Sequence, residues 1–128
     1  MENYVRLVAT SNCLSSEQIV RSLNIRGERV WDAGDRRGNT AILESESGWV
    51  ISSTAGKSLG VDVHIKSIMG LVSGLESDFK KFSEIPGCEV QISCAIYGSG
   101  APPLSFSKAI VEWVGRLGAS LDIDIYRI

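Results

Sequence analysis

The chain has a single histidine and three cysteines, and neither residue type is spaced as a metal or redox site requires. Cys13, Cys88 and Cys94 form no CxxC pair, and an odd number of cysteines does not suit a disulfide scaffold. A zinc site needs several converging ligands, which one histidine and inward-facing cysteines do not supply. We therefore expect reduced thiols, no metal and no cofactor.

Long apolar runs and an excess of basic residues are also missing. No stretch approaches the ~18 apolar residues of a membrane span, and the N-terminus lacks the basic end and apolar run of a signal peptide. The formal net charge of −2 argues against a nucleic-acid binder, because such domains are usually strongly basic. We expect a cytoplasmic protein that binds neither membrane nor nucleic acid. A mildly acidic surface still suits a basic protein partner.

Catalytic motifs are incomplete. The segment Gly56-Lys57-Ser58 resembles the end of a phosphate-binding loop, but that loop needs a further glycine at position 51, where Ile51 stands. His64 has no nearby acid at useful spacing except Asp62, which favours a structural or solvent-facing histidine over a Cys-His nucleophile pair. No catalytic residue is assigned, and a non-enzymatic role is expected.

The longest pattern present predicts a single helix from Asp62 to Ile85. Its apolar residues follow the three- and four-residue steps of one helical face, and Pro86-Gly87 ends it. Two shorter helices are predicted, one capped by Ser15 and one running from Ser107 to Leu117. The inner stripe of the last helix is predicted to consist of Ile110, Val111, Val114 and Leu117.

Alternation of apolar and polar residues predicts the strands. They cover residues 4–10, 41–45, 48–53, 88–98 and 120–128, with a hairpin turn at Glu46-Ser47-Gly48. In the last strand Leu121, Ile123 and Ile125 are expected to face inward. Residues 1–128 then form a single domain with the order β-α-β-β-α-β-α-β. We expect an α+β fold in which one long and two shorter helices pack on a mainly antiparallel sheet of about five strands.

The polar segment of residues 25–40 carries the first candidate site. Trp31 is surrounded by arginines in the sequence, and Trp49 follows on the predicted hairpin; the arginines are Arg26, Arg29, Arg36 and Arg37. Tryptophan and arginine are enriched at interface hot spots, and a guanidinium beside an indole also suits a small anionic ligand. The alternative is that Trp31 closes the end of the core while the arginines pair with nearby acids, namely Glu28, Asp32 and Asp35.

Asp122 and Asp124 form the second candidate site. Because they are two residues apart on a strand, their side chains share one face at a spacing of about 7 Å. Such a pair can perform acid–base chemistry, but on an exposed face it more often protects an edge strand from wrong pairing. A third interpretation is an acidic strip that meets a basic partner.

Several segments together resemble a known family. They are the SSEQIVRSLNI helix after a first strand, the segment from Trp31 to Arg36, the aromatic Trp49, the strand VQISCAIYG, the stretch LSFSKAIVEWVGRLGA and the ending LDIDIYRI. The family is the one known as domain of unknown function 4279, and the resemblance spans nearly the whole chain. It implies a small bacterial α+β domain without an assigned activity.

In size and acidic character the chain also resembles small bacterial immunity proteins, which neutralise a neighbouring toxin. This is an analogy rather than a motif match. We expect a non-enzymatic protein-binding domain whose partner is a cognate toxin. The candidate binding residues are Trp31, Arg36, Arg37, Trp49, Asp122 and Asp124. The rival hypothesis is a sensor domain for a small anionic ligand, or an enzyme, that uses the region of Trp31, Arg36 and Arg37.

Overall fold

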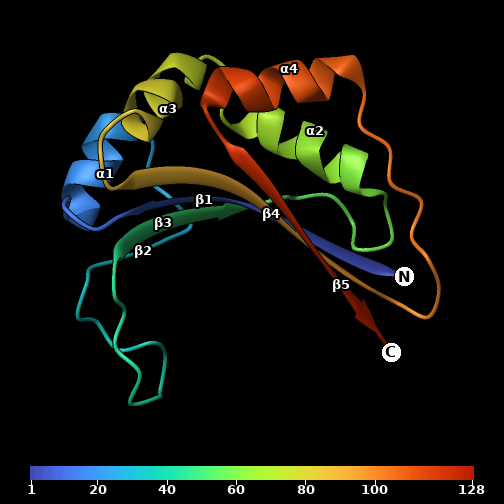
Figure 1. Cartoon of the computed structure of the whole chain (residues 1–128), viewed down its shortest axis with the longest axis horizontal. Coiled ribbons are helices and arrows are strands. Elements are labelled where there is room, and N and C mark those ends of the chain that lie inside the picture. Colours follow the sequence, from blue (N-terminus) through green and yellow to red (C-terminus); the bar gives the residue numbers. More distant parts are fainter.

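The computed structural model describes all residues from 1 to 128 and has one five-stranded sheet and four helices (Figure 1). The strands are β1 (Glu2–Ser11), β2 (Arg29–Trp31), β3 (Ser47–Ser52), β4 (Cys88–Gly98) and β5 (Ser120–Arg127). The helices are α1 (Ser16–Leu23), α2 (Val61–Leu71), α3 (Glu76–Ser83) and α4 (Lys108–Leu117). No helix combines the length and the apolarity that a membrane crossing requires. The predicted α+β class is confirmed.

The sheet is mixed, with the strand order β2-β3-β1-β4-β5. The central strand β1 is antiparallel to both β3 and β4, and β2 is antiparallel to β3. Strands β4 and β5 run parallel, and α4 supplies the crossover connection that parallel neighbours need. The prediction of a mainly antiparallel sheet is corrected at this pair. The alternation of apolar and polar residues within a strand does not show whether the neighbouring strand runs parallel or antiparallel to it.

The helix predicted from Asp62 to Ile85 is instead two helices, α2 and α3, so the fold has four helices rather than three. Between them Gly74 adopts a φ of 89°, a conformation that glycine alone reaches without strain. Of the predicted apolar stripe, Ile65, Ile68, Val72, Phe79 and Phe82 are buried, and Met69 and Leu75 are partly buried against the core. Apolar periodicity therefore identified the buried face correctly but not the bend.

The predicted hairpin is wrong, because β3 pairs with β1 and β2 and not with residues 41–45. Residues 41–45 contribute only an isolated bridge between Arg36 and Leu43. Gly48 is a strand residue and not part of a turn, and the ring of Trp31 lies so close to it that a Cβ atom there would overlap the indole. Gly48 thus allows the Trp31 ring of β2 to pack closely against β3. The prediction placed it in a turn because glycine is common in turns.

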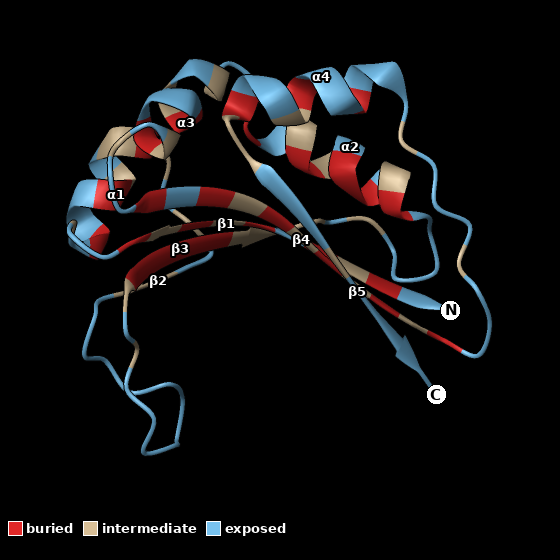
Figure 2. Ribbon diagram, viewed as in Figure 1, coloured by how far each residue is buried: buried red, intermediate tan, exposed pale blue.

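The helices cover one face of the sheet and bury a single core (Figure 2). The central strands contribute alternate residues to it, as predicted for Val5, Leu7 and Ala9 of β1 and for Val90, Ile92, Cys94 and Ile96 of β4. Among the largest fully buried side chains are Trp49, Trp113, Phe79 and Phe82. The core lies between the helices and the sheet, so the buried residues of each central strand are those whose side chains face the helices.

Three predicted core positions at the C-terminal end are exposed, one on α4 and two on β5. Val111 of α4 faces solvent, and Trp113 takes the buried position in its place. On β5, Leu121 and Ile125 do stand on the same side of the sheet as the core residues Ile92 and Ile96. They are 37% and 50% exposed, however. The helix layer leaves the outer strand partly uncovered, so an inward orientation on β5 does not bring burial.

A charge placed in the apolar stripe tests the core. Val72 has no exposed surface, so Val72→Asp would bury an unpaired carboxylate at a cost of several kcal/mol, comparable with the ~5–15 kcal/mol stability of a typical domain. We expect this variant to lose its cooperative thermal transition in circular dichroism. The matched control is Val111→Asp on the exposed face of α4, which should shift the unfolding free energy by no more than about 0.5 kcal/mol. A cooperative melt of Val72→Asp close to that of the wild type would exclude the stripe from the core.

Candidate functional site

The face of the sheet opposite the helices has no covering layer, and we call it the open face (Figures 1 and 2). Because side chains alternate along a strand, the strand register determines which residues meet there. One row across the sheet pairs Arg6 of β1 with Ser52 on one side and Ser93 on the other, and Ser93 is next to Asp122. The open face therefore combines side chains from all parts of the sequence on one surface.

All three tyrosines of the chain lie on the open face, and we call them the tyrosine cluster. The rings of Tyr97 and Tyr126 are stacked, with centroids 4.8 Å apart and 15° between their planes. Tyr4 meets Tyr97 edge-on at 5.7 Å. Such pairs contribute about 0.5–1.5 kcal/mol beyond the area that they bury. The cluster is ordered by its own packing but keeps exposed surface, since Tyr126 is 46% exposed.

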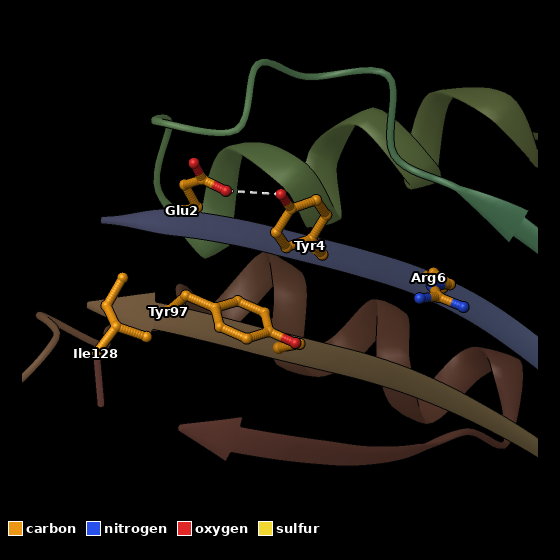
Figure 3. Close-up of a pocket in the computed structure, with 6 residues that line it drawn as sticks. Glu2, Tyr4, Arg6, Tyr97 and Ile128 are labelled. Carbon is orange, nitrogen blue, oxygen red and sulfur yellow. Dashed lines mark hydrogen bonds between the residues drawn. The ribbon is translucent and has the colours of Figure 1, made fainter. Parts of the chain in front are cut away.

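A cavity of about 350 Å³ adjoins the tyrosine cluster, and we call it the Arg6 cavity (Figure 3). Its lining consists of Glu2, Tyr4, Arg6, Ala95, Tyr97 and Ile128. The Tyr4 hydroxyl donates a hydrogen bond of 2.7 Å to the Glu2 carboxylate, whereas the exposed Arg6 guanidinium forms no ion pair within the protein. A free cation beside aromatic rings can accept an acidic or polar group of a partner.

Asp122 and Asp124 lie at one edge of the open face. Both are exposed, and neither takes part in a side-chain hydrogen bond or an ion pair within the protein. Since β5 is the last strand of the sheet, their position agrees with protection of an edge strand and equally with an acidic strip for a basic partner. The two carboxylates leave their charge available to a binding partner.

The two candidate tryptophans lie on opposite faces of the sheet. Trp31 is on the open face, where the guanidinium carbon of Arg29 is 4.6 Å from the ring centroid. Trp49 is fully buried in the core, and its Nε1 donates a hydrogen bond of 3.0 Å to the carbonyl of Ile25. Trp31 shares the open face with Asp122 but lies at the opposite edge, roughly 19 Å away across four strand spacings of about 4.8 Å. The structure therefore does not combine these candidates into one compact site.

Arg36 and Arg37 belong to residues 32–46, which form an exposed arm projecting from the sheet on the side away from the helices (Figure 1). The Arg37 Nε donates a hydrogen bond of 2.9 Å to Glu44. This contact raises the pKa of Arg37 and lowers the pKa of Glu44. The acids predicted to pair with the arginines have other partners, since Glu28 accepts a hydrogen bond from Ser52 and Asp32 accepts from Ser16. Neither arm arginine lines the Arg6 cavity.

His64 is buried at the start of α2, and its Nδ1 is 2.7 Å from the Ser53 hydroxyl. A serine and a histidine at this distance resemble part of a catalytic triad. The other ring nitrogen, Nε2, has no hydrogen-bond partner, so no carboxylate orients the ring or stabilises an imidazolium. The contact joins the segment after β3 to α2.

The three cysteines are all free thiols in different environments. Cys13 is exposed, whereas Cys88 and Cys94 are buried. Burial raises the pKa of Cys94 to about 11, with a contribution from the charge of Asp122. Burial also raises the pKa of Cys88, whose Sγ donates a hydrogen bond to the Ser11 hydroxyl. Thiols with raised pKa values hold little thiolate at neutral pH and are poor nucleophiles.

The tyrosine cluster and Arg6 were not among the candidates derived from the sequence. Their signal was nevertheless present, because Tyr4, Arg6, Tyr97 and Tyr126 all occupy the outer positions of predicted strands. Alternation assigns each residue to a face but does not say which strands are neighbours. The stacking of Tyr97 on Tyr126 depends on the parallel pairing of β4 with β5, which the sequence pattern did not predict.

The chain matches the model of a protein family described as a domain of unknown function (DUF4279) over residues 1–127. The chain therefore belongs to this family, as the resemblance of its segments predicted. No curated protein and no solved structure matches it. The family description names no activity.

Thiol labelling is expected to separate Cys13 from the two buried cysteines. At neutral pH a maleimide should react with Cys13 in the native protein, because burial and raised pKa values protect Cys88 and Cys94. Intact-mass spectrometry should show a single adduct before unfolding and three after it. Cys13→Ser should abolish the native adduct. Rapid native labelling of Cys94 would contradict its place in the core.

Proposed function

We propose that this DUF4279 chain is a non-enzymatic protein-binding domain and that its partner docks on the open face of the sheet. The observation that carries the proposal is the tyrosine cluster beside the unpaired Arg6 on a sheet face that no helix covers. Tyrosine and arginine are among the residues most enriched at the centres of protein interfaces. A preformed aromatic patch also loses little conformational freedom on binding.

The charges around the patch favour a partner with mixed polarity. Arg6 of β1 offers a cation at the Arg6 cavity, and Asp122 and Asp124 offer carboxylates on β5, two strands away. Complementary charges accelerate association and select partners more than they increase affinity. A cognate toxin that presents basic residues to the acidic edge remains the form of partner that we propose. The chain would then act as an immunity protein, neutralising the toxin by direct binding.

Variants of the open face test this function. Arg6→Glu combined with Tyr97→Ala removes the cation and breaks the aromatic stack, so a partner captured by the wild type should be lost. The matched charge control is Lys66→Glu on the exposed side of α2, which should retain the partner. Affinity is measured by titration of the purified partner, and circular dichroism confirms that each variant is folded.

The arm provides the contrasting result. Arg36→Glu with Arg37→Glu changes exposed side chains of the arm that do not line the Arg6 cavity, and it should leave open-face binding within about threefold of the wild type. For the toxin form of the hypothesis, co-expression with the product of the adjacent gene should restore growth with the wild type and not with the open-face variant. Binding that is lost only in the arm variant would refute the open face as the site.

A small anionic ligand remains the second candidate function, and one observation favours it. The Arg6 cavity, at about 350 Å³, is large enough for a small molecule and contains a cation with no partner in the protein. This location differs from the region of Trp31, Arg36 and Arg37 proposed from the sequence. A set of small carboxylates and inorganic phosphate should then raise the melting temperature of the wild type but not that of Arg6→Glu.

A further inference from the structure

The outer edge of β5 carries a row of backbone groups without partners. The Ile128 N–H donates a hydrogen bond to the Gly98 carbonyl of β4. Because backbone groups alternate in direction along a strand, every second residue before Ile128 also turns its N–H and C=O groups towards β4. Leu121, Ile123 and Ile125 therefore turn theirs outwards. Apart from the β4–β5 ladder, no hydrogen bond of the protein involves a residue of β5. A strand of 8 residues thus ends the sheet as an unused hydrogen-bonding template.

The two sides of this edge differ in chemistry. On the open face Asp122 and Asp124 stand two residues apart, exposed and unpaired. On the helix side Leu121 and Ile125 keep 37% and 50% of their surface exposed, because the helix layer leaves the outer strand partly uncovered. A strand added at this edge would place one set of its side chains beside the carboxylates and the alternate set beside the apolar residues.

A second copy of this chain is disfavoured in the central registers of this edge. An antiparallel pair of β5 strands centred on Asp122, Ile123 or Asp124 sets aspartates of the two copies directly opposite each other. Like charges in directly opposed positions destabilise a sheet. The occupant must instead carry cations at the positions that face Asp122 and Asp124.

The opposite edge of the sheet lacks these features. Strand β2 has only 3 residues, and the arm continues directly from it. Its open-face side chains, Arg29 and Trp31, already contact each other. Strand addition is therefore specific to β5.

We propose that β5 binds an extended segment of a partner protein in which basic residues alternate with apolar ones, so that the segment becomes a sixth strand of the sheet. The inference rests on the proposed protein-binding function and names the chemistry of the partner. Backbone hydrogen bonds to Leu121, Ile123 and Ile125 supply the pairing, and the basic side chains meet Asp122 and Asp124. A basic toxin would present such a segment in its own edge strand or in an extended terminus.

The probe is a synthetic peptide of alternating lysine and valine with the length of β5, 8 residues. At low salt it should bind, and amide hydrogen exchange followed by NMR should show new protection of the N–H groups of Leu121, Ile123 and Ile125. A peptide of the same composition with its lysines in one block should bind at least about tenfold more weakly, because it cannot place cations and apolar residues on opposite faces.

Variants of the protein complete the test. Asp122→Lys with Asp124→Lys should weaken peptide binding at least about tenfold, whereas Glu84→Lys with Glu112→Lys, the same change of charge on the exposed helix layer, should not. Ile125→Pro removes an outward N–H without touching the ladder to β4, so it should stay folded by circular dichroism and lose the peptide.

Three results would overturn the inference. They are equal binding of the two peptides, binding without protection of the β5 amides, and a dimer in sedimentation experiments that protects those same amides. The experiments distinguish a failure of strand addition at β5 from a failure of the proposed protein-binding function. A partner that is lost by the Arg6 and Tyr97 variant but retained by the β5 variants would leave open-face binding intact while excluding strand addition.

Discussion

The one-sided apolar pattern of the central strand pair is the constraint on which this fold depends. Strands β1 and β4 pair over ten positions, and the apolar residues that they bury in the core all point to one side. Every helix must therefore pack on that side, because only there does burial remove apolar surface from water. The opposite side keeps polar and aromatic residues, among them Tyr4, Arg6 and Tyr97. The open face is thus a direct consequence of the way the core is built.

Local patterns in the sequence identified much of this architecture. Alternation located the central strands and their inward residues, and the caps at Ser15 and Ser107 correctly marked the starts of α1 and α4. These features depend on neighbours within a few residues, so a single sequence contains them. The same holds for the buried stripe of α2 and α3, whose periodicity continues across the bend at Gly74.

Features that depend on distant pairing could not be obtained in this way. The pairing of β2 with β3 joins segments separated by the arm. The contact between Trp31 and Gly48 can be inferred only when that pairing is known. Trp49 resembled Trp31 as a surface candidate, yet strand register places it in the core. The candidate site changed for the same reason, since the tyrosine cluster needs three strands in the right order. Asp122 and Asp124 could be recognised as a candidate site without knowledge of strand pairing, because both carboxylates lie on one strand.

The contact of Trp31 with Gly48 also restricts how this family can change during evolution. With the indole in place, position 48 has no room for any side chain, and with a side chain at 48 the indole has no place to lie. The two positions are expected to vary together across homologous chains: a tryptophan at the first with glycine at the second, or a small residue at the first where the second has gained a Cβ. A side chain gained at position 48 alone would clash with the indole and push β2 away from β3, whereas loss of the indole alone would leave the space against Gly48 unfilled. Substitutions at these two sites are therefore expected to be accepted as a pair.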